Sequence, residues 1–167
     1  MPLQPPADVL TRTPVYRMVH IGCLDTLLQR DALHAPSQCP DDGLPYRSIH
    51  AVQTQADRGG TPVPCGPGGA IRDYVGFYFG PRSPMLYRLH TGYNVAAVPQ
   101  AEIVYLVAHA QTLVGAGSRC VFTDRHSLAR FAAFREHLAD PGIVDFGVAY
   151  AEQWKTTVAH PDRQERK

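Results

Sequence analysis

The residues of this chain that could do chemistry follow none of the common catalytic templates. Its four cysteines have neither the CxxC spacing nor the accompanying histidine pair of a zinc site. The GPGG at 66–69 lacks the lysine and serine of a phosphate-binding loop, so it is typical of a turn. Neither GxSxG nor HExxH occurs. We therefore expect no metal ion, and a site built from scattered histidine, arginine and aromatic side chains.

Arginine dominates the cations of the chain. Of the sixteen Lys plus Arg, Lys155 and Lys167 are the two lysines, so fourteen are arginines. A planar guanidinium binds phosphate with two hydrogen bonds and stacks on bases. A GC-rich genome would produce the same bias. The net charge of +1 therefore argues neither for nor against a nucleic-acid partner.

The elements that must position these side chains follow from hydrophobic periodicity. The pattern predicts a strand at 15–21 that runs into a helix at 25–35, with His20 at the junction. Residues 36–69 are rich in Pro and Gly, with one or two helical turns possible at 49–57, and long loops of this kind often carry function. An aromatic strand is predicted at 73–79.

The second half continues with alternating elements. Ser83 and Pro84 are placed to cap a helix at 85–91. The later predictions are a buried strand at 103–107, a short strand at 120–123, a helix at 124–138 and a charged helical start at 160–167. The irregular order favours an α+β fold over a parallel array. We expect a flexible lead-in at 1–13, with its three prolines, and one domain at 14–167.

Targeting signals are absent from the pattern. The start of the chain has no apolar segment of a secretory signal, and no apolar run approaches the ~18 residues of a membrane span. The expected location is the cytoplasm, with reduced cysteines.

Several segments together resemble the DarT family, the DNA-modifying toxins of the DarT–DarG toxin–antitoxin pair. The most specific is 73–87, DYVGFYFGPRSPMLY. Others are YRMVHIGCLDTLL at 16–28, EIVYLV at 102–107, VFTDRH at 121–126, and Trp154 with HPDR at 160–163. They occur in the family order and cover nearly the whole chain from Tyr16 onwards.

The resemblance implies an ADP-ribosyltransferase fold of the diphtheria-toxin and PARP type, with a split mixed β-sheet core and flanking helices. It also implies a reaction, in which NAD loses nicotinamide and ADP-ribose joins a thymine or guanine base of single-stranded DNA. The implied partners are NAD, single-stranded DNA and a DarG-like macrodomain antitoxin, and the chain is expected to be a monomer without a membrane or metal.

The resemblance implies roles for individual residues, according to their positions in the matching segments. Arg58 matches the catalytic arginine, and Arg47 is the fallback because the register there is uncertain by a residue or two. The residues expected to bind NAD are His20, Ile21, Gly22, Gln29 and Tyr78. The residues expected to contact DNA are Arg82, Met85, Arg119, Arg125 and His126. For a histidine or methionine taken alone, ordinary core packing is at least an equal explanation.

Two departures from the family pattern affect these expectations. Cys23 stands where the family often has Asn, and packing as a small apolar residue is the alternative. The family's catalytic glutamate is expected after Lys167, and Glu102, which precedes a predicted buried strand, is expected to face solvent. We therefore expect a truncated domain that is inactive or nearly so.

Two other hypotheses remain open at this point. One is a binding module of the same fold that recognises nucleic acid or a protein without using NAD. The other is an enzyme similar to the RNA 2'-phosphotransferases, in which Arg58, Arg82 and Arg125 would surround a phosphate. Thermal stabilisation by NAD would separate the transferase from a pure DNA-binding module.

Overall fold

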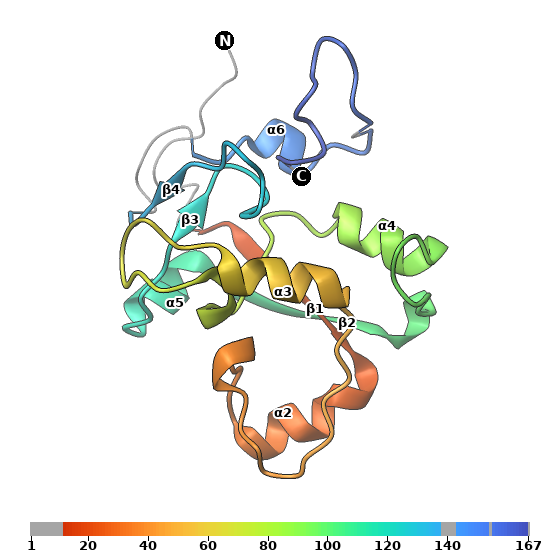
Figure 1. Cartoon of the computed structure of the whole chain (residues 1–167), viewed down its shortest axis with the longest axis vertical. Coiled ribbons are helices and arrows are strands. Elements are labelled where there is room, and N and C mark those ends of the chain that lie inside the picture. The colour runs from red at the N-terminus through yellow and green to blue at the C-terminus, as the bar shows by residue number, and fades with distance from the viewer. Residues whose placement is uncertain (1–11, 138–142, 154, 167) are drawn as a thin grey trace.

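The computed structural model describes residues 12–137, 143–153 and 155–166 of the chain. At its centre, strands β1 (Pro14–His20) and β2 (Ile103–His109) pair antiparallel (Figure 1). The register sets Pro14 opposite His109 and His20 opposite Ile103. This pairing brings the end of β1 next to the residues that immediately precede β2, although some eighty positions separate them in sequence.

β1 occupies the interior position of the sheet. On its other side Tyr16 exchanges two backbone hydrogen bonds with Tyr78, both 2.8 Å long. Residues from Arg17 to His20 are all buried. The prediction of a buried strand at 103–107 is correct in position and wrong in burial, since β2 is only partly buried and Val107 is 56% exposed. Among the described residues β2 pairs only with β1, so its other edge is open and its side chains are less covered than those of β1.

The chain leaves β1 through a short 3-10 helix η1 (Ile21–Cys23) and then helix α2 (Leu24–Arg30). His20 is thus at a strand–helix junction, as predicted. α2 ends before the predicted limit of residue 35, because Asp31 adopts a left-handed backbone conformation with φ of 46°. That conformation stops helical hydrogen bonding.

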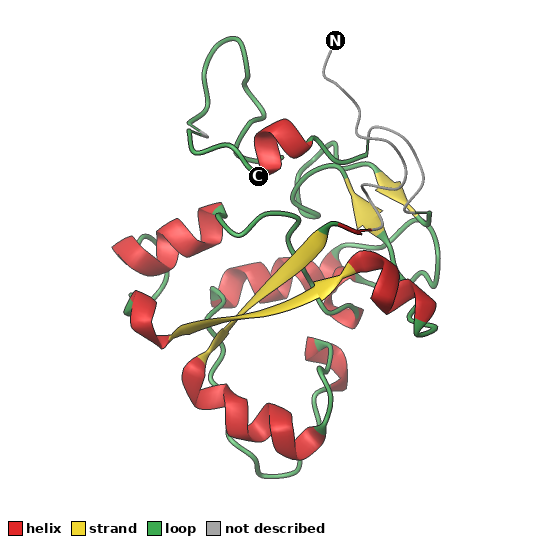
Figure 2. Ribbon diagram, turned by 180° about the vertical axis from the view of Figure 1, so that it is seen from behind, coloured by secondary structure: helices red, strands yellow, loops and turns green. Residues whose placement is uncertain are grey.

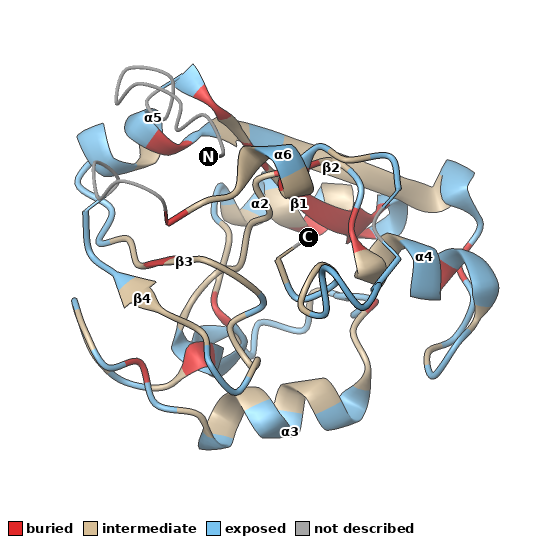
Figure 3. Cartoon of the chain, turned by 90° about the horizontal axis from the view of Figure 1, so that it is seen from above, coloured by how far each residue is buried: buried red, intermediate tan, exposed pale blue. Residues whose placement is uncertain are grey.

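The long segment after α2 contains a 3-10 turn η2 (Pro36–Gln38), helix α3 (Val52–Gly60) and a turn stabilised by the pairing of Pro62 with Ala70. The helix begins and ends three residues later than predicted. Gly66, Gly68 and Gly69 have positive φ, and the predicted GPGG turn is confirmed. Viewed from above, α3 and the β1–β2 pair lie on opposite sides of the molecule (Figure 3).

The predicted aromatic strand at 73–79 is wrong as a continuous strand. The 3-10 helix η3 (Ile71–Asp73) occupies its start, closed by the Asp73 carboxylate, which accepts a hydrogen bond from the Ala70 amide. Tyr78 alone pairs with β1. The alternation of side chains is nevertheless retained, because Phe77 and Phe79 pack on one apolar cluster and Tyr78 on another.

Helix α4 (Pro84–Thr91) confirms the capping prediction. The Ser83 hydroxyl accepts a hydrogen bond from the Leu86 amide at 3.3 Å, and Pro84 occupies the first turn. Gly92, with φ of 76°, ends the helix. A 3-10 turn η4 (Gln100–Glu102) then leads into β2, so α4 and η4 approach the end of β1 that carries His20.

The predicted helix at 124–138 is wrong over its described part, 124–137. Strands β3 (Phe122–Thr123) and β4 (Phe134–Arg135) form a second antiparallel pair there. The Asp124 carboxylate accepts a hydrogen bond from the Ala133 amide, which closes the connection as a loop, and Phe131 is 73% exposed. Residues 160–166 form turns rather than a helical start.

Two apolar clusters use opposite faces of β1. Val15 joins Ala110, Phe122 and Ile143, whereas Met18 joins Ile49, Leu89 and Val98. Helix α5 (Ala110–Gly115) contributes to the first cluster, while helix α6 (Phe146–Ala149) brings Phe146 edge-on to Phe79, a neighbour of that cluster. Helices, short antiparallel sheets and long loops are interleaved (Figure 2), so the α+β prediction is confirmed.

Three further expectations concern the chain as a whole. Of the predicted lead-in at 1–13, the described residues are Arg12 and Thr13, and Thr13 is buried. Within the described ranges no helix is long and apolar enough to cross a membrane. In the same ranges no group of three His, Cys, Asp or Glu is arranged to hold a metal ion, and the expectation that none is needed stays a prediction.

Candidate functional site

One set of polar groups gathers where β1 ends. The Nε2 atom of His20 lies 2.8 Å from a carboxylate oxygen of Glu102 and 2.8 Å from Nη1 of Arg47. The same oxygen of Glu102 is 3.7 Å from Nη1 of Arg47. We call His20, Arg47 and Glu102 the His20 cluster. The expectation that Glu102 faces solvent is only partly correct: its side chain is 40% exposed, but the antiparallel register also places it beside His20 at the end of β1.

The hydrogen bonds of His20 fix where its proton lies when the ring is neutral. Its Nδ1 atom accepts a hydrogen bond from the Gly22 amide at 2.9 Å, so this nitrogen carries no proton. Nε2 then carries the proton and donates it to Glu102. In that tautomer Nε2 cannot also accept from Arg47, which we read as an ion-pair partner of Glu102. Glu102 therefore orients the His20 ring.

The other residues expected to bind NAD lie around this junction. Ile21 and Gly22 form the exposed start of η1, and Gln29 is exposed on α2. Cys23 is fully buried, and its thiol donates to the Arg47 carbonyl at 3.4 Å. Its surroundings fit packing as a small apolar residue, the alternative considered for this position.

A second set of polar groups surrounds Arg17, which precedes Met18 on β1, whereas His20 follows it. Nη1 of Arg17 donates to the Gly76 carbonyl at 3.0 Å. A Cβ added to Gly76 would lie 3.1 Å from Nη2 of Arg58, so both guanidinium groups meet at this glycine. His50 is also close, because it lines a small hollow together with Arg17 and Gly76. We call Arg17, His50 and Arg58 the arginine cluster.

The titration of this cluster reflects burial and excess positive charge. Burial and the neighbouring charges of Arg17 and Arg58 lower the pKa of His50 to about 4. Burial lowers the pKa of Arg58, and Arg17 acts in the same direction while Tyr78 opposes it. His50 is therefore a neutral imidazole at pH 7.

Tyr78 and Met85 border the arginine cluster. They line a small hollow together with Arg17, His50 and Gly76. Burial raises the pKa of Tyr78, and the charges of Arg58, Arg17 and Arg88 act in the opposite direction. The structure thus brings Tyr78 and Met85 together, and Arg58 lies beside Gly76 at the edge of the hollow. The hollow combines an aromatic face, an apolar side chain and hydrogen-bond donors.

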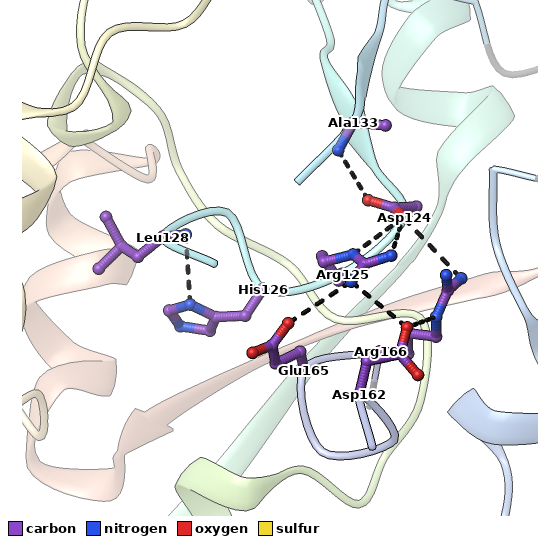
Figure 4. A network of polar contacts seen from close by, with 8 residues as sticks. All are labelled: Asp124, Arg125, His126, Leu128, Ala133, Asp162, Glu165 and Arg166. Carbon is purple, nitrogen blue, oxygen red and sulfur yellow. Dashed lines mark hydrogen bonds and ion pairs between the residues drawn. The ribbon is translucent and has the colours of Figure 1, made fainter. Parts of the chain in front are cut away.

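The connection between β3 and β4 carries His126 towards the same region. His126 is exposed, and its pKa is lowered by partial loss of hydration and by the charges of Arg58 and Arg88, while the charge of Glu165 acts in the opposite direction. Beside it, Arg125 forms ion pairs with Asp124, Asp162 and Glu165 at 3.0, 3.3 and 3.5 Å (Figure 4). Its side chain is 11% exposed, so this guanidinium is occupied by carboxylates.

Two arginines expected to contact DNA lie on the surface outside these clusters. Arg82 is 57% exposed and lies 3.3 Å from the Glu152 carboxylate. Arg119, between α5 and β3, is exposed, and its charge acts on Tyr74. The roles of Arg82, Met85, Arg119, Arg125 and His126 in DNA contact remain predictions, as do those of the NAD-site residues.

The sequence patterns did not single out Arg17, His50 or Glu102 as members of the site. A signal for Arg17 was present, since it is a charged residue inside an apolar strand pattern. Glu102 would have been found from the pairing of the strands at 15–21 and 103–107, which sets residue 20 beside residue 103. No local pattern marks His50.

Comparison with known proteins assigns a family to this architecture. The model of the family described as "ssDNA thymidine ADP-ribosyltransferase, DarT" matches residues 16–167. A DNA ADP-ribosyl transferase of Thermus sp. (strain 2.9) is 37% identical over 155 residues, which cover 93% of this chain and 71% of the relative. Another, from Escherichia coli O127:H6, is 34% identical over 110 residues, 65% of this chain and 50% of the relative.

Solved structures agree with this assignment. Thermus sp. 2.9 DarT in complex with ADP-ribosylated single-stranded DNA superposes with a TM-score of 0.82, at 37% identity and over 93% of this chain and 71% of that one. The same relative in complex with NAD+ gives a TM-score of 0.72 at 35% identity, with the same coverage. The predicted ADP-ribosyltransferase fold is confirmed by these matches.

Proposed function

Since the chain belongs to the DarT family, we propose that it transfers ADP-ribose from NAD to thymine in single-stranded DNA. The match of the family model from residue 16 to residue 167 carries this proposal. The relative solved with NAD+ and with ADP-ribosylated single-stranded DNA supports it, because both substrate classes are bound by a protein of the same fold.

The proposed reaction exchanges one bond of the anomeric carbon of NAD for another. The bond to the nicotinamide nitrogen breaks, and its electron pair leaves with neutral nicotinamide. A nitrogen of the thymine base forms the new bond with its lone pair and releases its proton. Positive charge builds on the ribose in the transition state, as in glycoside hydrolysis. The protein must therefore orient both partners and stabilise the charges that move.

For NAD, the proposal assigns the end of β1 and the aromatic segment. His20, held in one tautomer, offers a fixed ring to the ribose or the amide of NAD, beside the backbone groups of Ile21 and Gly22. Gln29, exposed on α2, is a further polar contact. Tyr78 stacks on nicotinamide with its ring face. The convergence of His20 with Glu102 and Arg47 supports a site at this junction.

For the acceptor base, the proposal assigns Arg58 as the catalytic residue. Its guanidinium lies beside Gly76, and Tyr78 is near enough to act on the pKa of Arg58. There it can stabilise negative charge on the base as the proton leaves. Arg47, the other candidate, is instead a member of the His20 cluster and is 56% exposed. This placement favours Arg58 for the base and Arg47 for the NAD side.

The DNA strand is assigned to the side chains around this centre. Met85 supplies an apolar wall for the base, and His126 and Arg82 supply polar contacts to the strand. Arg119 is exposed and lies farther from this centre. Arg125, held by three carboxylates, serves best by positioning the His126 connection. We further propose that the protein acts as a toxin controlled by a DarG-like macrodomain antitoxin.

Mass spectrometry of oligonucleotides tests the proposed function. The full gene product is incubated with NAD and single-stranded oligonucleotides that contain or lack thymine. The expected result is a gain of one ADP-ribose on thymine-containing strands, abolished by Arg58→Ala and retained by Arg130→Met, an exposed arginine packed on Phe131. Transfer to strands without thymine would reject the base assignment, and the absence of any transfer would reject the function.

A further inference from the structure

Arg17 is a buried arginine, with 8% of its surface accessible. It lies in the middle of β1, between Tyr16 and Met18, where an apolar residue would be expected from burial alone. Its Nη1 atom donates to the Gly76 carbonyl, but its Nε atom is buried without a hydrogen-bond partner. A buried donor left in this state is costly, and it calls for an acceptor.

A second guanidinium group lies at the same point. Nη2 of Arg58 lies against Gly76, where a side-chain Cβ would approach it to 3.1 Å. Arg17 lowers the pKa of Arg58 through the repulsion of like charges, after burial itself. Among the described residues, no carboxylate forms an ion pair with Arg17 or Arg58, in contrast to Arg125 nearby.

The groups around the two arginines complete a donor-rich hollow. His50, Tyr78 and Met85 line it with Arg17 and Gly76, and its volume suits one water-sized group, such as a single oxygen atom of a phosphate. His50 and Arg58 have no hydrogen bond from their side chains to any described residue. On the outer side, the charges of Arg58, Arg88 and Glu165 all act on His126. The charged groups that act on His50 itself are the two cations Arg17 and Arg58.

Two cations at close range in a buried position destabilise each other unless an anion compensates them. Two other arginines whose side chains have little exposure lie beside an acid, Arg125 with Asp124 and Arg30 with Asp42. The compensating anion at Gly76 therefore comes from outside the described chain. Guanidinium groups select planar or tetrahedral oxyanions, because their forked donors match two oxygens.

We propose that Arg17, His50 and Arg58 form an oxyanion subsite that binds a phosphate group of the substrates. This proposal rests on the proposed function, which supplies two sources of that chemistry, the diphosphate of NAD and the backbone of the DNA strand. Arg17 and His50 provide N–H donors from the lining of the hollow, and Arg58 provides its guanidinium from beside Gly76. The subsite extends the site beyond the residues that the family resemblance assigned.

Calorimetric titration of the full gene product tests the subsite, with inorganic pyrophosphate as the probe. We expect saturable binding that weakens as salt is added. Arg17→Met should weaken it roughly 10- to 100-fold, since charge-assisted hydrogen bonds contribute ~1.5–3 kcal/mol. Arg17→Lys keeps the charge without the fork and should recover part of the loss. Arg130→Met, which removes an exposed cation, should bind like the wild type.

Two further ligands distinguish the sources of the phosphate. ADP-ribose carries the diphosphate of NAD without nicotinamide, and an abasic oligonucleotide carries the DNA backbone without bases. The ligand whose affinity falls with Arg17→Met identifies the source. If pyrophosphate binds but neither of these depends on Arg17, the assignment to a substrate phosphate is wrong.

Stability measurements keep the test valid if a variant binds poorly. Removal of an uncompensated buried cation should leave the melting temperature of Arg17→Met without ligand equal to the wild type or higher.

Gly76→Ala gives an independent approach, because its Cβ displaces the Arg58 guanidinium by a few tenths of an ångström and should weaken pyrophosphate binding a few-fold. Unchanged pyrophosphate affinity in both variants would overturn the subsite even if DNA is modified normally. Arg17-dependent binding without any transfer would instead reject the proposed function.

Discussion

The two polar clusters carried by β1 differ in charge balance. In the His20 cluster, Glu102 lies between a histidine and Arg47, at 2.8 and 3.7 Å. In the arginine cluster, Arg17 and Arg58 meet at Gly76, and His50 is neutral beside them. Only two residues of β1, Met18 and Val19, separate Arg17 from His20.

This difference teaches what each cluster is ready to do. In the His20 cluster, Glu102 balances the charge of Arg47 and orients the His20 ring, so a ligand meets a ring in a fixed tautomer. The arginine cluster is unsatisfied among the described residues, so it gains most when a negatively charged group binds. We infer that the first orients NAD and the second stabilises negative charge.

The largest effect is expected from Arg58→Ala, which removes half of the charge of the arginine cluster. Transfer should fall by about 10²–10³-fold, the usual cost of losing a donor that stabilises transition-state charge. The free energy of unfolding should change little, since Arg58 forms no ion pair with a described residue. Initial rates with saturating NAD measure the effect. A loss of less than tenfold would contradict the catalytic assignment.

The second-largest effect is expected in the pH dependence of stability, which depends on His50 of the arginine cluster. The pKa of His50 falls from 6.5 unfolded to about 4 folded, so the unfolded chain binds more protons in this window. Stability should therefore decrease as pH falls from 6.5 to 4, by at most about 3 kcal/mol from this residue. Urea unfolding across this range should show a flatter pH dependence in His50→Gln. The exposed His109→Gln is the matched control, and equal slopes in all three proteins would refute the half-buried, neutral His50.

A smaller effect is expected when the balance of the His20 cluster is broken. Glu102→Ala removes the acceptor of the His20 Nε2 proton and should weaken NAD binding about tenfold, from the ~1–2 kcal/mol of such a hydrogen bond. Glu102→Gln retains an acceptor oxygen and should restore most of the affinity. Pyrophosphate binding at the arginine cluster should not change.

NMR of the histidine ring nitrogens provides a readout of Glu102 that does not depend on activity. His20 should have its proton on Nε2 in the wild type and in Glu102→Gln. In Glu102→Ala both neutral tautomers should be populated. An unchanged single tautomer in Glu102→Ala would show that the Gly22 amide alone orients the ring.

The smallest effect should come from the cap of α4, the helix that carries Met85 and Arg88. Ser83→Ala removes the hydroxyl that accepts from the Leu86 amide and should cost about 1 kcal/mol of unfolding free energy. Because α4 borders the arginine cluster, DNA affinity should fall more than NAD affinity. Ser118→Ala, in an exposed turn, is the control. Equal losses for the two substrates would mean that the clusters respond as one unit.

The sequence predicted local features better than long-range ones. The strand ending in His20, the Ser83 cap and the GPGG turn depend on residues close in sequence, and all three are present. The helix at 124–138 was wrong because the bond from the Asp124 carboxylate to the Ala133 amide, nine residues apart, closes a loop there. Periodicity could not reveal that contact.

The residues of the site were also only partly predictable, because some are marked by local segments and others join the site through long-range contacts. Family resemblance pointed to His20, Arg58 and Tyr78, which lie in or beside the two clusters. Arg17 and Glu102 belong to the site through strand pairing and side-chain reach, which no single segment encodes. Arg125 was expected on the DNA strand, and its three carboxylate partners come largely from the distant residues 162 and 165.

The most direct test of the account counts nicotinamide against modified bases. The full gene product is incubated with NAD in the presence and absence of a thymine-containing single-stranded oligonucleotide, and both products are quantified in the same reaction. The account predicts one nicotinamide released for each ADP-ribosylated thymine, with release depending on the DNA. Release of nicotinamide without modified thymine would show NAD hydrolysis rather than transfer, and would contradict the account.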